Sequence, residues 1–286
     1  MINASRIAAS LAVFTVIGIA LVVAQPSLTP PAGPIEVSGR FGTLIEINEQ
    51  NTPGDGSVRH IISEPGSYVL TGNADAGSRN GIRIDSDSVT LDLNGYTING
   101  TGIAGGIVPP AQFPSREIRG VTVRNGRIDG FERGILGRMS NLVEMADVKF
   151  ANTLISDIEI RATSGIDLEF ATIENCRIIA TSLGIGVANS TIRDTTVRMI
   201  GAEGQSFRAG MATTNCNVVG CTVDMSGSGA ITTFAYSAAS TLFRGCHASG
   251  AVTGFSINTG SVATDCYSNS ATNTLLTGAQ TFNSNF

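Results

Sequence analysis

The chain has 286 residues, which is enough for a large hydrophobic core in one or two domains. Hydrophobic residues make up 42% and charged residues 14% of it, which argues against a disordered, highly charged tail. The net charge of −5 argues against the broad basic surface that nucleic-acid-binding proteins present, so we expect no nucleic-acid partner.

The N-terminus has the pattern of an export signal. Arg6 precedes an uncharged apolar run over residues 7–24, which ends in Val22-x-Ala24. This pattern is typical of a secretory signal peptide, although a run of this length is also at the lower limit for a membrane-spanning helix. We expect a signal peptide over residues 1–24, cleaved after Ala24, with a retained N-terminal anchor as the alternative. The protein is then secreted, periplasmic or at the cell surface, with no further membrane contact.

Residues 25–57 are expected to hold a linker and an N-terminal cap. The segment 25–40 is rich in Pro, Gly and Ser, as linkers are. A cap over about residues 35–60 is expected because the open end of a repeat fold exposes strand edges and core.

From residue 58 onward, two short phrases recur. The first is Gly, apolar, polar, apolar, as in GIRI at 81, GIDL at 165 and GIGV at 184. The second places two apolar residues three positions apart, which a straight strand cannot direct to one face. A sharp bend solves this, because the residue between them tolerates the left-handed conformation. The bend residues are Gly120 (in IRGVTV), Asp157, Asn175, Asp194, Gly220, Gly245 and Asp265.

The spacing of the copies indicates a solenoid. Successive anchor positions after the bend are 18 to 26 residues apart: Ile158, Cys176, Thr195, Cys221, Cys246 and Cys266. Each copy then forms one coil of three short parallel strands, and coils stack at roughly 4.8 Å with right-handed crossovers. The sequence predicts an all-β, single-domain, right-handed parallel β-helix over residues 58–286, with about eight to ten coils.

Three segments interrupt the repeats. Residues 101–117, 136–154 and 199–209 are expected to be insertions, and the register of LVEMADVKF within the second is not assigned. Loops of this kind often wall a groove.

The phrases ISEPGSYVLTGN, NGIRIDSDSVTLDLNGYTING and GVTVRNGRIDGF resemble repeats of the pectin-lyase-like superfamily of right-handed parallel β-helix proteins. More narrowly, they resemble secreted bacterial β-helix proteins of unassigned function. The resemblance covers about residues 58–286 and implies the fold. It does not imply one activity, because the superfamily includes lyases, hydrolases, epimerases, adhesins and phage tailspikes. The motifs of classical pectate lyases (WxDH, RxPxxR) and of polygalacturonase-like hydrolases (NTD, DD, GHG, RIK) are missing.

Histidine and cysteine chemistry is scarce. His60 and His247 are the only histidines, and both are expected at the surface. Four cysteines share the inward position after the bend, which predicts a stack of core thiols. Export would permit disulfides as the alternative, although parallel neighbours suit their geometry poorly. Cys216 is expected to be an exposed thiol at a turn, and no zinc site is expected.

Charged residues are predicted to form two outward columns. The strand of the Gly phrase places Arg83, Asp85, Arg138, Asp167 and Glu169 outward. The strand after the bend places Arg124, Glu159, Arg161, Arg177 and Arg198 outward. A row of arginines suits uronate carboxylates, and clustered carboxylates suit Ca²⁺. The alternative is that these residues only keep the surface soluble, in weak ion pairs such as Glu159 with Arg177.

Two functions remain open from the sequence. The first is a non-catalytic, exported β-helix that contacts an acidic polysaccharide or cell-surface glycan through the arginine column. The second, suggested by the resemblance, is a polysaccharide lyase or related carbohydrate-active enzyme that acts on an acidic glycan. Its catalytic candidates are Asp85, Asp167, Glu169 and Arg138, with the three carboxylates holding Ca²⁺. No cofactor is expected otherwise. There is no Trp, so sugar stacking would need Phe or Tyr side chains, of which Tyr68 and Tyr96 are expected to pack in the interior instead of joining Tyr236 and Tyr267.

Overall fold

The structure is a computed structural model that describes residues 43–111, 116–141, 146–201, 207–227, 232–258, 260–270, 272–275, 279–282 and 284–285. The predicted signal peptide and linker lie outside these ranges, apart from the cap residues from 43 onward. Residues 42–286 form one compact unit. Among the described residues, no helix is long and apolar enough to cross a membrane.

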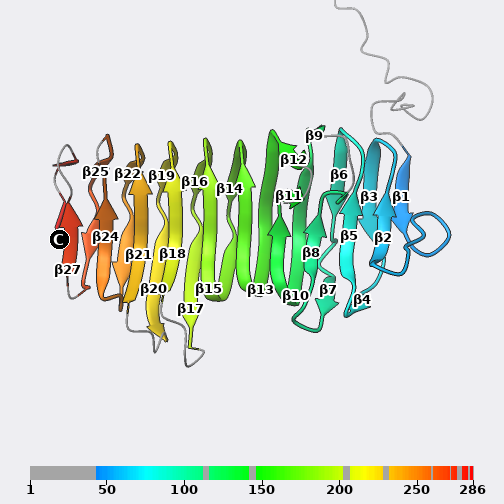
Figure 1. The fold of residues 1–286 in the computed structure, drawn as a ribbon, viewed down its shortest axis with the longest axis horizontal. Coiled ribbons are helices and arrows are strands. Elements are labelled where there is room, and N and C mark those ends of the chain that lie inside the picture. The colour runs from blue at the N-terminus through cyan, green and yellow to red at the C-terminus, as the bar shows by residue number, and fades with distance from the viewer. Residues whose placement is uncertain are drawn as a thin grey trace, which may run out of the picture. The chain divides into compact units, whose positions relative to one another are not determined.

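The chain folds as a parallel β-helix, as predicted (Figure 1). A 25-stranded sheet winds around the axis, and its ladders are parallel. Within each coil the chain passes through three faces, here called A, B and C. The strands β10 (Thr122–Leu136), β13 (Thr153–Glu169) and β15 (Arg177–Ala188) run through more than one face.

Face A carries the Gly phrase and holds ten strands, so the described chain makes ten coils, at the upper end of the prediction. They are β2 (Val58–Ile62), β5 (Asn80–Ile84), β8 (Gly105–Val108), the ends of β10, β13 and β15, β18 (Phe207–Thr214), β21 (Thr232–Ala239), β24 (Thr253–Ile257) and β27 (Thr272–Leu275).

Faces B and C precede and follow the predicted bend. Face B contains β1 (Leu44–Ile47), β3 (Gly66–Leu70), β6 (Val89–Asp92), the starts of β10 and β13, β14 (Ala171–Glu174), β16 (Thr191–Arg193), β19 (Asn217–Val219), β22 (Leu242–Arg244), β25 (Val262–Thr264) and β28 (Gln280–Phe282). Face C contains β4 (Ala74–Gly77), β7 (Thr97–Gly100), the middle of β10 and β13, the start of β15, β17 (Thr196–Ile200), β20 (Thr222–Gly227), β23 (His247–Ser249) and β26 (Tyr267–Ser268).

All seven predicted bend residues have positive φ, between 49° and 69°. Six of them turn the chain from face B to face C. Gly120 instead lies at the corner from face A to face B, and the B-to-C bend of its coil is Asn125, with φ 59°. The prediction that IRGVTV contains the bend from face B to face C is therefore wrong. Both corners need residues that tolerate the left-handed region, so the residue type alone does not distinguish them.

The glycine of the Gly phrase is required by close contact between coils. In face A, Gly81, Gly106, Gly134, Gly165 and Gly184 stack on one another. A Cβ on any of them would lie only 2.3 to 2.6 Å from the carbonyl oxygen of the next glycine in the column. Since real Cβ atoms do not approach so closely, a side chain here would force the coils apart.

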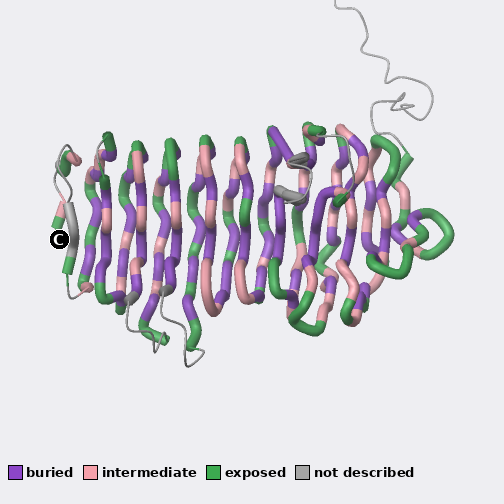
Figure 2. Tube along the Cα trace, in the orientation of Figure 1, coloured by how far each residue is buried: buried purple, intermediate pink, exposed green. Residues whose placement is uncertain are grey.

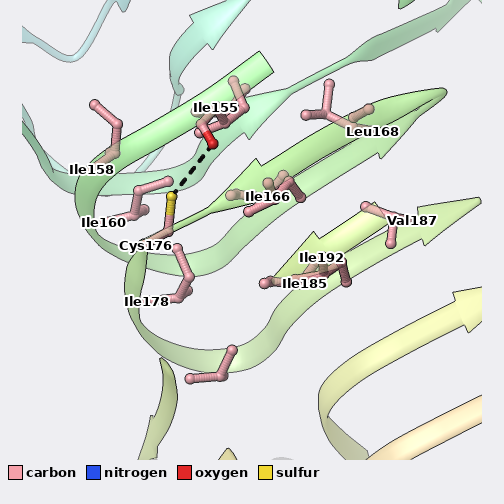
Figure 3. Packing of buried hydrophobic residues seen from close by; sticks show 14 of the residues in the cluster. Ile155, Ile158, Ile160, Ile166, Leu168, Cys176, Ile178, Ile185, Val187 and Ile192 are labelled. Atoms are coloured by element: carbon pink, nitrogen blue, oxygen red, sulfur yellow. Dashed lines mark hydrogen bonds between the residues drawn. The ribbon is translucent and has the colours of Figure 1, made fainter. Parts of the chain in front are cut away.

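The core is a continuous stack of mainly aliphatic side chains, among which isoleucine is the commonest, and Figure 3 shows part of it. Buried residues recur in every coil along the chain (Figure 2). The four predicted core cysteines are all buried and unbridged. Their thiols donate to the carbonyl two residues earlier, and buried Thr195 does the same with its hydroxyl. Burial raises the pKa of Cys176 to about 11 and that of Cys221 to about 12, so both stay protonated at neutral pH.

Cys216 is buried as well, so the expectation of an exposed thiol is wrong. It follows Asn215, the left-handed residue of the A-to-B corner, and its thiol donates to the carbonyl of Thr214. The equivalent residues Ser190 and Thr241 make the same bond. In these three successive coils, the inward place after the corner is therefore held by a small side chain that donates a hydrogen bond to the carbonyl two residues earlier.

The insertions are shorter than predicted, because regular strands lie inside two of them. Residues 101–117 contain β8, an ordinary face A strand. Residues 136–154 contain β11 (Arg138–Asn141) and β12 (Ala146–Ala151), which pair antiparallel. β12 also pairs parallel with β9 (Arg116–Arg119), which forms a separate three-stranded sheet and sets the register that the sequence left open. Of residues 199–209, the first two end β17 and the last three begin β18, whereas 202–206 lie outside the described residues.

His60 lies in β2 of the first coil and is buried, so the prediction of a surface histidine is wrong. The segment before β2 folds over it, and Thr52 lies within hydrogen-bond distance of Nδ1 through both its hydroxyl, at 3.2 Å, and its carbonyl, at 3.1 Å. Burial lowers the pKa of His60 below its ordinary value of 6.5.

Stability is therefore expected to fall when the pH drops below about 6.5. Below this pH the unfolded chain binds a proton on His60 while the folded chain does not. The unfolding free energy then falls by up to about 1.4 kcal/mol per pH unit. Urea midpoints between pH 7.5 and pH 5 measure this effect, and His60→Asn should flatten the dependence. His247→Asn, the same change on the outer surface, should keep it. Parallel pH profiles for His60→Asn and the parent would contradict the prediction.

Candidate functional site

The outer side of face C carries a column of charged residues from separate coils. Arg127 pairs in register with Glu159, Glu159 with Arg177, and Arg177 with Thr196. Each alternates with buried core residues along its strand, so the side chains point away from the core. Parallel in-register stacking therefore places them one coil apart.

Glu159 is the hub of this arginine cluster. Its Oε1 lies 2.8 Å from Nη2 of Arg127 and 3.2 Å from Nε of Arg161, and its Oε2 lies 3.4 Å from Nη1 of Arg177. The carboxylate is 20% exposed, whereas the three arginine side chains are between 41% and 54% exposed. One carboxylate thus lies among three guanidinium groups that all reach solvent.

A second outward column runs beside the first. It places Asp129, Arg161, Ile179, Arg198 and Asp224 on successive coils. Arg198 lies 3.9 Å from Asp224, a loose ion pair. The column is mixed in charge, with the cations in the middle coils and a carboxylate at each end.

A shallow groove adjoins the cluster where face C turns toward face A. It has a volume of about 400 Å³ and its lining includes Asp129, Arg161, Thr163, Thr181 and Ile200. This is within the roughly 300–1,000 Å³ typical of small-ligand sites. Arg161 belongs to both the groove and the cluster, so a chain lying in the groove would meet the guanidinium groups directly.

Three of the four arginines that were predicted to form one column lie on face C, but they are divided between its two columns, Arg177 in the first with Glu159, and Arg161 and Arg198 in the second. Arg161, Arg177 and Arg198 lie on face C, as does Glu159, and the suggested ion pair of Glu159 with Arg177 is present. Arg124 lies on face B, where it pairs with Asp92 at 3.0 Å. Its place on face C is taken by Arg127, which the sequence reasoning missed because of the misassigned bend. The phrase VRNGRI, with Asn125 as its bend, was the signal.

The second predicted column lies on face A, but its residues fall into two separate groups. Arg83 pairs with Asp85 at 2.9 Å and with Asp55 at 3.2 Å. Asp167 is three ladder steps farther along, roughly 14 Å at the spacing of parallel strands. Asp85, Asp167 and Glu169 therefore do not converge on one Ca²⁺ site. In the described part of the chain, no group of three such side chains is arranged to hold a metal.

A small pocket surrounds the single lysine of the chain. Lys149 lies 3.4 Å from Glu117 and 3.5 Å from Glu169, and its Nζ is 5.4 Å from the centre of the Phe170 ring. Asp167 also lines this pocket, whose volume is about 120 Å³. Hydrogen bonding from Arg119 lowers the pKa of Glu117. The side chain of Arg138 lies outside the described residues, and its backbone pairs with Lys149 in the three-stranded sheet.

The strand pairing defines the class of protein: the chain is a parallel β-helix protein. No family model matches the sequence, and the curated proteins contain no match.

Eleven chains of solved structures match it, among them the following two. The Dettilon tailspike protein has 13% sequence identity and a TM-score of 0.38, with 84% of this chain and 61% of that chain covered. The A-module of the mannuronan C-5 epimerase of Azotobacter vinelandii has 8% identity and a TM-score of 0.30, with 77% of this chain and 87% of that chain covered. This chain thus spans less than two thirds of the tailspike chain.

Proposed function

We propose that this protein is an exported, non-catalytic β-helix that binds an acidic polysaccharide of the uronate type on face C. The observation that supports it best is the arginine cluster, in which three partly exposed guanidinium groups surround the one carboxylate of Glu159 beside a groove of ligand size.

The chemistry of the cluster suits a polyanionic chain. Glu159 has two oxygens for three guanidinium groups, so donor N–H groups remain for a ligand. Arginine binds carboxylates through paired, charge-assisted hydrogen bonds. Exposed ion pairs contribute only about 0–1 kcal/mol, so a ligand carboxylate can replace them at little cost.

Replacing both Arg161 and Arg177 by Ser is expected to abolish binding of polygalacturonate and of polymannuronate, because two of the three guanidinium groups are lost. Parent binding should weaken as salt rises, since the Debye length falls from about 10 Å at 0.1 M to about 3 Å at 1 M. Calorimetric titration with both polymers, and with neutral dextran for comparison, measures this.

The matched control is the double change Arg193→Ser and Arg244→Ser. Both residues lie on face B at exposed positions, so the net charge changes equally while face C stays intact. The control should bind like the parent. Failure of the parent to bind either uronate polymer, or equal binding by the Arg161/Arg177 variant, would refute the proposal.

A polysaccharide lyase remains the second candidate, and the Lys149 pocket is the observation that favours it. Lysine next to Asp167 and Glu169 offers a base and carboxylates on one surface. The pocket is smaller than typical ligand sites, however, and Glu169 already pairs with the lysine. An assay for unsaturated uronate products, with and without added Ca²⁺, tests this candidate.

The proposed location outside the cytoplasm rests on Arg6, the apolar run and Ala24. We expect the mature protein to begin at Gln25. N-terminal sequencing of the protein from its native cell measures this. Recovery of an intact N-terminus in the membrane fraction would favour the anchor instead.

A further inference from the structure

The outward column of face C does not end at the arginines. From Thr196 the register continues to Thr222, then to His247, and then to Tyr267. Arg177 and Tyr267 are thus four ladder steps apart in one straight column, roughly 19 Å at the spacing of parallel strands.

The far end of this column is an aromatic pair. The rings of His247 and Tyr267 are stacked, with centroids 5.0 Å apart and an angle of 27° between their planes. Tyr267 is 46% exposed. It is the one exposed tyrosine of the four in the chain, because Tyr68 and Tyr236 are buried and Tyr96 packs against the core.

Such a pair has few structural reasons to lie on a solvated face. The same column carries short hydroxyl side chains in the two preceding coils, Thr196 and Thr222, which suit an exposed strand. Stacking covers one face of each ring, so the pair offers a ligand its apolar ring edges, the outer face of Tyr267 and the polar phenol hydroxyl. The less polar face of a pyranose ring, which carries C–H groups, packs well on such a surface.

We propose that the His247–Tyr267 pair is a second subsite for the same polysaccharide, so that the chain lies along face C parallel to the helix axis. Uronate carboxylates bind the arginine cluster, the threonine hydroxyls lie along the middle, and one sugar ring stacks on the aromatic pair. This inference rests on the proposed function. It adds that the ligand is an extended polymer, because only a chain of several sugar units covers the distance between the two subsites.

The dependence of affinity on ligand length follows from this geometry. A disaccharide is too short to reach from Arg177 to Tyr267, so it engages the arginine cluster alone. An octasaccharide engages both subsites, and the second contact adds to the first without a new loss of translational freedom. The parent should therefore bind the octasaccharide at least about tenfold more tightly than the disaccharide, beyond the statistical factor for a repeating ligand.

The test uses size-fractionated galacturonate and mannuronate oligomers, the parent and two variants. Tyr267→Ala should weaken octasaccharide binding about tenfold and leave disaccharide binding unchanged. Leu242→Ala is the matched control: it removes a side chain of similar exposure on face B of the adjoining coil and should change neither.

A second readout follows the ring signals of His247 by NMR. The chain has only two histidines, and His60 is buried in the first coil, so the two are readily told apart. The octasaccharide should shift the His247 signals, and the disaccharide should not.

The outcomes separate the two proposals. If the parent binds no uronate oligomer, the proposed function itself fails. If it binds, but Tyr267→Ala affects neither ligand or His247 does not respond to the octasaccharide, the aromatic subsite is wrong and the arginine site stands.

Discussion

Replacing Cys246 by Asp is expected to lower the unfolding free energy by several kcal/mol and the melting temperature by about 10 °C or more. The side chain of Cys246 is 1% exposed, and its thiol points toward the carbonyls of Val218 and Arg244. A carboxylate there would lose its hydration and meet acceptor oxygens, the least favourable partners for an anion. Thermal and urea unfolding followed by circular dichroism measure the loss.

Cys246→Thr is the matched control for this change. Thr195 occupies the equivalent position two coils earlier, and its hydroxyl donates to the carbonyl of Arg193 as the thiol of Cys246 does to that of Arg244. Cys246→Thr should therefore cost about 1 kcal/mol or less. Cys246→Asp unfolding at the parent's midpoint would mean that the coil register is wrong.

Replacing Gly184 by Ala is expected to destabilise the protein by about 2–3 kcal/mol, although alanine is ordinarily better than glycine in a strand. The added Cβ would lie 2.3 Å from the carbonyl oxygen of Gly210 and 2.3 Å from Cγ1 of Val197. The first contact is with backbone in the next coil, so relief requires the coils to separate and weakens their ladder. Urea midpoints of parent and variant measure the effect.

Gly186 provides the control within the same strand. Its added Cβ would come close to the flexible end of Leu183, at 3.0 Å, while the nearest backbone atom of another coil, the carbonyl oxygen of Ile166, is 4.0 Å away. Gly186→Ala should be neutral or stabilise by about 0.5 kcal/mol. If Gly184→Ala is equally harmless, the close approach of the coils at the glycine column is not what selects glycine there.

Local rules and repetition made the fold predictable. The bend residues are recognised because few residue types tolerate positive φ, and all seven that were predicted have it. The inward position of Cys176, Cys221, Cys246 and Cys266 follows from counting residues after each bend, which needs no knowledge of distant segments. Each copy of the repeat confirms the others, so one misassigned corner did not change the predicted architecture.

The site was less predictable, because it depends on which coils are neighbours in space. Arg127 and Arg177 both meet Glu159, yet they lie 32 and 18 residues from it in the sequence. The interval from Arg127 to Glu159 is the longer one because the chain passes through β11 and β12 between them. No repeat phrase indicates the register of these two strands. One misplaced bend was therefore enough to exchange Arg127 for Arg124.

By itself, the sequence determined the class of fold, the bends and the inward cysteine stack, since these depend on residues a few positions apart. Only the tertiary structure decided that His60 is buried under the segment before it, that Asp85 and Asp167 are three coils apart, and that Arg177 shares a straight column with Tyr267. In a β-helix, the face on which a residue lies depends on residues a few positions away in the sequence. Its position along the helix axis depends on the lengths of all preceding coils and loops. Each loop whose path the sequence does not indicate therefore adds to the error of the predicted axial position.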